Sequence, residues 1–229
     1  MRSLSFLIHL AVAFVVAVDV VPGPAQQGAI AGRVILPAIQ VVKTRAQRGR
    51  EYRNRQNLTR PTKAAPKKKQ PFTAVVISAH GRGTNAKPLS EPVMMEQLNL
   101  AFVPRVLPVT VGSTVHFVNY DRIYHNVFSL DVVKMNIGRR ETGTIVEKVI
   151  DQTGAIELFC DIHPQMNGTI LSLDTPYYTH PDSTGAFALG PLPIGAYEIR
   201  VFHPDLSHDA VAVEVTAGKG SDLELTLSR

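Results

Sequence analysis

The stretch Phe159-Cys160-Asp161-Ile162-His163-Pro164-Gln165-Met166 organises the interpretation of the whole sequence. It holds the only cysteine of the chain, followed by a histidine three residues later and a methionine six residues later. A thiolate, an imidazole and a thioether in one short loop can converge on a single metal ion. Residues 155–160, just before the loop, alternate as a strand does, with Ile156, Leu158 and Cys160 on one face. If Ile156 and Leu158 face the core, we expect the sulfur to face it too.

One more ligand is needed, and His125 is the best candidate upstream. It lies in Asn119-Tyr120-Asp121-Arg122-Ile123-Tyr124-His125-Asn126, directly after residues 114–120, which alternate as a strand. His116 competes with it, but His116 is opposite in phase to Val115 and Phe117, so we expect it to face solvent or a partner sheet. The other histidines show no ligand-like spacing among themselves.

Two imidazoles, one thiolate and a weak axial thioether form a type 1 (blue) copper site, which is acceptable to both Cu(II) and Cu(I). We therefore predict one copper ion held by His125, Cys160, His163 and Met166. Asn126 follows the first histidine and is placed to brace the ligand loop by hydrogen bonds. Phe159 is expected to keep water away from the metal and to tune its potential.

The first residues predict export. Arg2 precedes an apolar run over residues 4–18, and Gly23-Pro24-Ala25 offers small residues for cleavage, so we assign residues 1–25 to a signal peptide. An uncleaved membrane anchor is the alternative, although the run is shorter than the roughly 18 residues that a span needs. A lone cysteine cannot form a disulfide within the chain, so in a periplasmic or extracellular setting it must be buried or ligated.

The net charge of +5 comes from one stretch of the chain. Eleven of the 24 basic residues lie between residues 43 and 69, where Glu51 is the only acidic residue. Acidic residues outnumber basic ones elsewhere, which disfavours nucleic-acid binding. The basic stretch has few large apolar residues, so we expect a disordered linker over residues 43–70. It is also a candidate contact for an acidic partner or an anionic membrane surface.

The remaining residues indicate an all-β chain with many turns, in keeping with its 16 glycines and 16 prolines. We expect an N-terminal strand within residues 26–42, a strand and loop over residues 71–92, and short strands at 97–102 and 106–111. Residues 93–173 then form the metal-binding domain. Residues 174–229 form a small antiparallel β-sandwich, which is marginal alone and either packs on the preceding domain or recruits the strands at 29–37 and 72–80.

Residues 93–173 resemble the cupredoxin family. Val109-Thr110-Val111-Gly112-Ser113-Thr114-Val115-His116-Phe117-Val118-Asn119 and His125-Asn126-Val127 are similar to the first half of a plastocyanin-like domain. Cys160-Asp161-Ile162-His163-Pro164-Gln165-Met166 resembles the ligand loop of amicyanin, including Pro164, which this resemblance places beside the metal site. It implies a Greek-key sandwich, one type 1 copper, a surface-near His163 as the electron port and Asn126 as a supporting residue. The tail from Asp174 resembles carboxypeptidase-regulatory-like or carbohydrate-binding-like sandwiches, and the combination resembles exported methylamine-utilisation-like proteins.

The sequence therefore favours an exported blue copper protein that moves single electrons between redox partner proteins and is not an enzyme. A copper storage or delivery protein would use the same ligands. A metal-free structural or carbohydrate-binding sandwich is a third possibility, because of the C-terminal module. The chain has no His-x-His motif of the kind that multicopper oxidases need. A Cys–His nucleophile suits this proline-bearing loop less well than a metal does.

Overall fold

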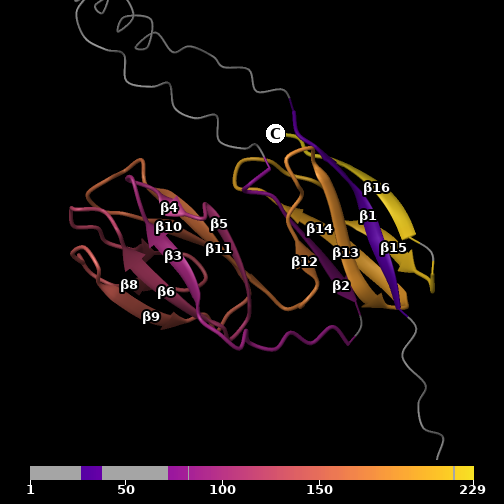
Figure 1. The fold of residues 1–229 in the computed structure, drawn as a ribbon, viewed down its shortest axis with the longest axis horizontal. Helices are drawn as coiled ribbons and strands as arrows, with labels where there is room; N and C mark the ends of the chain where they lie inside the picture. The colour runs from indigo at the N-terminus through magenta and orange to yellow at the C-terminus, as the bar shows by residue number, and fades with distance from the viewer. Residues whose placement is uncertain (1–26, 38–71, 82, 219) are drawn as a thin grey trace, which may run out of the picture.

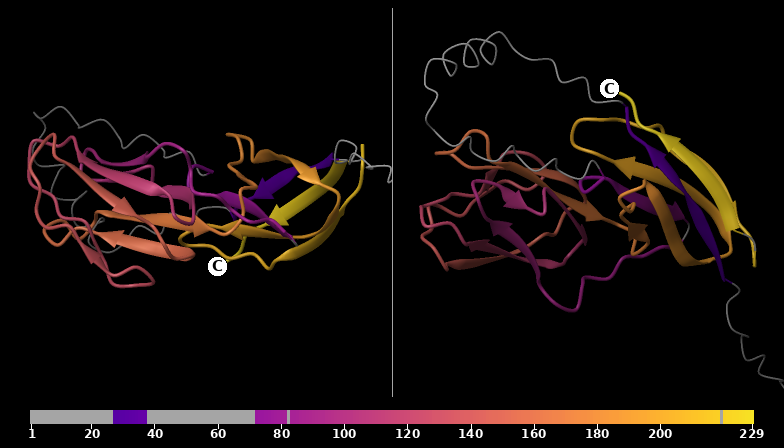
Figure 2. Two further views of the ribbon diagram at one scale, coloured as in Figure 1. Left: turned by 90° about the horizontal axis from the view of Figure 1, so that it is seen from below. Right: turned by 45° about the horizontal axis from the view of Figure 1, so that its top comes forward.

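The computed structural model describes residues 27–37, 72–81, 83–218 and 220–229. In these ranges the chain forms sixteen strands and no helix, which confirms the all-β prediction. The strands make two β modules that lie side by side (Figures 1 and 2). The predicted signal peptide and the basic linker lie outside the described residues, and the described part contains no helix with the length and apolar character to cross a bilayer.

The first module contains two sheets that enclose an apolar core. One sheet has the order β4-β3-β6-β9 and the other the order β5-β11-β10-β7-β8. Its strands are β3 (Val93–Gln97), β4 (Phe102–Val103), β5 (Val106–Thr110), β6 (Thr114–Asn119), β7 (Phe128–Ser129), β8 (Met135–Asn136), β9 (Ile145–Val149), β10 (Gly154–Phe159) and β11 (Asn167–Leu173).

Alternation of side chains explains which face of β6 and β10 is inside. Ile156 and Leu158 on β10 are completely buried while Glu157 between them is exposed. On β6, Phe117 is buried, whereas His116 points away from the core and its Nε2 lies 3.2 Å from Glu147 Oε2. The expected outward orientation of His116 is confirmed.

The prediction of a strand over residues 97–102 is wrong. β3 ends at Gln97, and Asn99 and Leu100 have left-handed backbone angles, with φ of 55° and 59°. This conformation cannot continue a strand, so the chain turns back into β4, which pairs antiparallel with β3. The apolar residues at 98, 100 and 101 have a composition typical of a strand. Backbone amides of this segment, however, donate hydrogen bonds to a distant side chain, described below, and these bonds stabilise a turn.

The second module combines strands from both ends of the chain. It contains β1 (Gln27–Ile35), β2 (Val76–Gly81), β12 (Tyr178–Thr179), β13 (Ala186–Pro193), β14 (Gly195–Phe202), β15 (Val211–Val215) and β16 (Gly220–Thr226). β1 lies between β13 and β16, and β2 lies between β12 and β14. The C-terminal strands thus recruit both early strands. The pairs in these two sheets are antiparallel except β1–β16, which is parallel.

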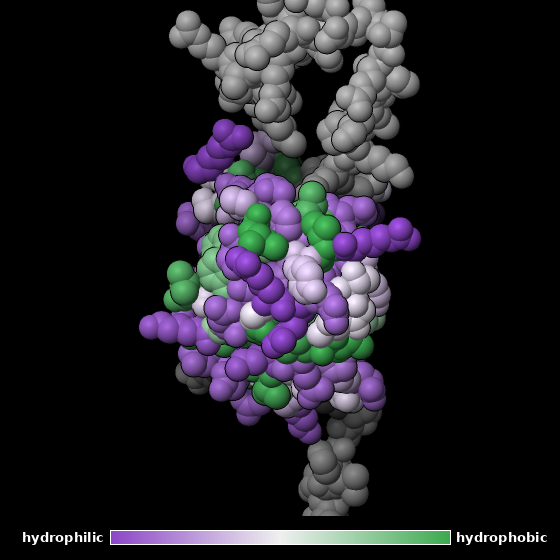
Figure 3. All heavy atoms as spheres, turned by 90° about the vertical axis from the view of Figure 1, so that its left-hand side faces the viewer, coloured by the Kyte–Doolittle hydropathy of each residue, from purple (hydrophilic) through white to green (hydrophobic). Residues whose placement is uncertain are grey.

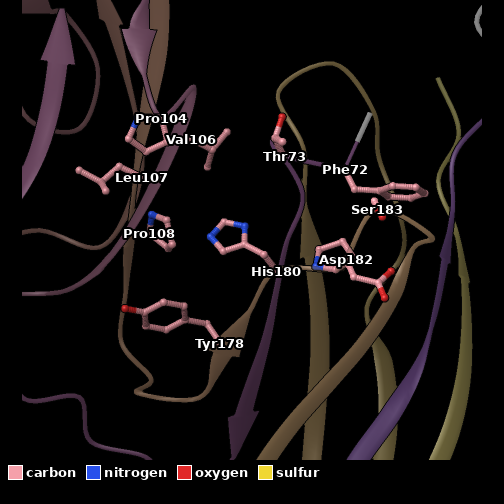
Figure 4. Close-up of a pocket in the computed structure, with 11 residues that line it drawn as sticks. Phe72, Thr73, Pro104, Val106, Leu107, Pro108, Tyr178, His180, Asp182 and Ser183 are labelled. Atoms are coloured by element: carbon pink, nitrogen blue, oxygen red, sulfur yellow. The ribbon is translucent and has the colours of Figure 1, made fainter. Parts of the chain in front are cut away.

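A small apolar cluster joins the two modules. Ala74, just before β2, and Val76, its first residue, pack against Val106, Leu171 and Leu173 of the first module. Beside this cluster lies an open, mainly apolar cavity of about 580 Å³, between residues 104–108 and 178–183 (Figure 4). The two modules therefore share a minor core in addition to the separate core of each one.

Candidate metal centre

β10 delivers Cys160 to the interior of the first module. The strand ends at Phe159, and Cys160 is the next residue, a free thiol with 4% of its surface exposed. It belongs to the same core cluster as Val127, Ile156 and Met166. The inward orientation predicted from the alternation is therefore observed.

His125 reaches the cysteine from the loop between β6 and β7. Its backbone forms an isolated bridge with Arg140, with hydrogen bonds of 3.1 and 2.7 Å. The Asn119 side-chain amide donates to the carbonyls of Ile123 and Arg140, at 2.8 and 2.9 Å, and so anchors both sides of the loop. The His125 side chain is completely buried.

The donor atoms of His125, Cys160 and His163 form a compact triangle. The two Nδ1 atoms are 3.0 Å apart, and the Cys160 Sγ lies 3.8 Å from that of His125 and 3.7 Å from that of His163. A triangle of these dimensions has a centre about 2 Å from every corner, and bonds from a first-row metal to imidazole and thiolate are about 2.0 and 2.3 Å long. The donor set therefore fits one small metal ion, with thiolate and imidazole ligands of the kind that copper prefers.

The loop after Cys160 is held at two points. The Met166 amide donates to the carbonyl of His163 at 2.9 Å, which closes a tight turn between them. Arg139 contacts the Asp161 carboxylate through Nη2 at 3.2 Å and Nε at 3.3 Å. Met166 is 1% exposed and lies in the core, whereas His163 is half-buried. His163 is thus the member of the cluster that reaches the surface.

Asp121 is a site residue that the sequence reasoning missed. Its Oδ2 accepts a hydrogen bond from His125 Nε2 at 2.8 Å and one from the Leu100 amide at 2.9 Å. Its Oδ1 accepts from the Asn99 amide at 2.6 Å. One carboxylate therefore fixes the turn between β3 and β4 and orients the His125 ring, so that Nδ1 faces the cysteine.

Several contacts act on the pKa of Asp121. Partial burial by itself raises this pKa, but hydrogen bonds from the Leu100 amide, His125 and the Asn99 amide outweigh it, and the pKa lies below its ordinary value. Asp121 is thus an anion at neutral pH and a strong acceptor for the His125 N–H. The signal was present in the sequence, because Asp121 is the only acidic residue in the stretch 119–126 and carboxylates commonly orient metal-binding histidines.

The three predicted supporting residues have different surroundings. Asn126 is buried next to His125, but its Oδ1 has no hydrogen-bond partner among the described residues. The ring of Phe159 lies 5.8 Å from that of Phe128 on the neighbouring strand. Pro164 is exposed in the ligand loop. Their influence on a bound metal stays a prediction.

No family model and no curated protein matches this sequence. Solved structures do show similarity. A copper-containing nitrite reductase from Thermus scotoductus is 28% identical over 38% of this chain and 23% of its own, with a TM-score of 0.35. A purple cupredoxin from Nitrosopumilus maritimus is 26% identical over 36% of this chain and 98% of its own, with a TM-score of 0.33. The Cu(I) form of a mutant amicyanin is 17% identical over 42% of this chain and 99% of its own, with a TM-score of 0.35.

Proposed function

We propose that this protein is an exported type 1 copper protein that transfers single electrons between redox partners. The observation that carries the proposal is the triangle of His125 Nδ1, His163 Nδ1 and Cys160 Sγ, whose size suits one metal ion. Copper, when bound there, would supply a reversible Cu(II)/Cu(I) couple. Met166, buried beside the cysteine, is the proposed axial ligand.

Preformed ligands support electron transfer in particular. His125 is fixed by its bridge to Arg140 and by Asp121, and Cys160 is buried at the end of a regular strand. A rigid ligand set of two imidazoles and one thiolate changes little between the two copper oxidation states, so reorganisation on electron transfer is small. The apolar core around Cys160 and Met166 excludes water and contributes to the potential.

Surface features support a docking role for the edge around His163. The half-buried His163 gives electrons a short route to the surface. Large hydrophobic side chains are exposed on the loop that carries His125, at Ile123 with 46% and Tyr124 with 56% exposure. At the outer end of this module, hydrophobic groups are set among polar ones (Figure 3). Apolar contacts with a polar rim suit transient partner proteins.

Voltammetry of the copper-loaded mature chain tests this role. The proposal predicts a reversible one-electron wave, with copper retained when a Cu(I) chelator is added after reduction. Loss of the copper to the chelator on reduction would instead identify a storage or delivery protein. A chain that binds Zn²⁺ but shows no copper-dependent wave would contradict the electron-transfer role.

A further inference from the structure

A second pocket lies at the junction of the two modules, lined by residues other than those of the metal centre. It has a volume of about 340 Å³, in the range of small-molecule sites. Ser78 and His80 line it from β2 and Arg200 lines it from β14, while Asp174 lies directly after β11 of the first module. Its remaining wall is largely apolar, with Leu171, Leu173, Val201 and Phe202.

Three side chains in this pocket form a continuous hydrogen-bonded chain. Ser78 Oγ lies 2.9 Å from His80 Nε2, and His80 Nδ1 lies 2.8 Å from Asp174 Oδ1. Ser78 and His80 are two residues apart on one strand and so share a face. With Nδ1–H donating to the carboxylate, Nε2 is left to accept the Ser78 proton, which is the order of roles in a serine nucleophile, its base and the acid that orients the base.

The surroundings of His80 suit a base. Burial lowers the pKa of His80, and the positive charge of Arg200 lowers it further, while Asp174 and Glu198 oppose the shift. The net effect keeps the imidazole neutral, and hence able to take a proton, at pH 7. The His80 side chain is 14% exposed and that of Asp174 65%, so the pocket opens to solvent on the side of the carboxylate.

The Arg200 guanidinium is the cationic group that lines this pocket. Its Nε donates to Glu198 Oε1 at 2.5 Å, which leaves the Nη groups for a ligand. These N–H groups can donate to a carbonyl oxygen that gains negative charge.

We propose that Ser78, His80 and Asp174 form a second site that hydrolyses small carboxylic esters. Ser78 Oγ bonds to the ester carbonyl carbon while its proton passes to His80 Nε2. The carbon–oxygen bond to the alcohol then breaks, and the departing alcohol takes that proton. Water then bonds to the carbonyl carbon of the acyl–Ser78 ester while one of its protons passes to His80 Nε2. The bond from that carbon to Ser78 Oγ breaks, the proton returns to Oγ, and the free acid leaves.

A fluorophosphonate probe and p-nitrophenyl acetate test this site in the full mature chain. We expect mass spectrometry of the wild-type protein to find the probe on Ser78. We also expect release of p-nitrophenol to fall about 100-fold or more in Ser78→Ala and in His80→Gln. Ser183→Ala is the matched control, because this hydroxyl lines the other cavity at the same junction and should leave turnover unchanged.

Adduct mapping needs no variant, so misfolding of Ser78→Ala cannot obscure the answer. Absence of the probe from Ser78, or p-nitrophenol release that Ser78→Ala leaves unchanged, would overturn the proposal. The hydrogen-bonded chain would then serve only to join β2 to the end of β11. Copper loading is irrelevant to either outcome, so this test is independent of the proposed electron transfer.

Discussion

Replacing Asp121 by asparagine should weaken copper binding without removing any proposed ligand. The Asp121 carboxylate accepts from His125 Nε2 and from the amides of Asn99 and Leu100. An amide in its place has one acceptor oxygen and no charge, so at least one of these three hydrogen bonds is lost and the rest are no longer charge-assisted. The contact that orients the His125 ring is then either lost or reduced to a hydrogen bond with an uncharged acceptor.

Loss of a group that orients a metal ligand typically lowers affinity about 10–100-fold, which corresponds to about 1.4–2.8 kcal/mol. Competition between the protein and a Cu(II) chelator of known affinity at pH 7 measures this loss directly. We expect Asp121→Asn to fall within that range while the far-ultraviolet circular dichroism of the fold is retained.

Glu147→Gln is the matched control, because it alters another carboxylate beside a histidine, His116, in the same module. It should leave copper affinity unchanged. Equal affinities for Asp121→Asn and the wild type would refute the role of Asp121, and so would an equal loss in Glu147→Gln.

Three further predictions address the ligand loop, the core and the junction. Met166→Leu conserves volume and should change the free energy of unfolding by less than about 1.5 kcal/mol. It should nevertheless raise the reduction potential in voltammetry, because the axial ligand tunes the potential and loss of an electron-pair donor destabilises the more highly charged Cu(II) more than Cu(I). An unchanged potential would exclude Met166 as a ligand. Gly168→Ala should lower the free energy of unfolding in urea by about 1–3 kcal/mol, because the added Cβ would lie 2.8 Å from the Cβ of Phe102. An unchanged free energy would contradict this and show that the backbone near Gly168 shifts to make room for the methyl group. The pKa of His80 is lower in the folded chain than in the unfolded chain, so folded His80 binds fewer protons. The free energy of unfolding should therefore fall as the pH drops below 6.5, until His80 is protonated in the folded chain too. Urea unfolding between pH 7.5 and 5.5 should show a smaller loss of this free energy in His80→Gln than in the wild type, and equal losses would contradict the prediction.

Local patterns predicted the core of the site well. Alternation over Ile156, Leu158 and Cys160 is a property of a single strand, and it correctly placed the sulfur inside. The choice of His125 over His116 followed from the phase of β6, and the structure places His125 Nδ1 beside the cysteine. Both inferences depend only on residues that are neighbours along the chain.

Features that depend on distant contacts were harder to predict. The turn at Asn99 and Leu100 exists because Asp121, more than twenty residues away, accepts hydrogen bonds from their amides. The early strands β1 and β2 carry no mark that assigns them to the second module, and only their pairing with β13, β14 and β16 does so. Asp174 and His80 likewise meet through tertiary packing alone.

Visible absorption of the Cu(II)-loaded mature chain tests the central claim most directly. The triangle of His125, His163 and Cys160 predicts an intense thiolate-to-copper charge-transfer band that is lost in Cys160→Ala. A colourless protein that takes up Cu(II), or a band that persists in Cys160→Ala, would contradict the proposed type 1 copper centre.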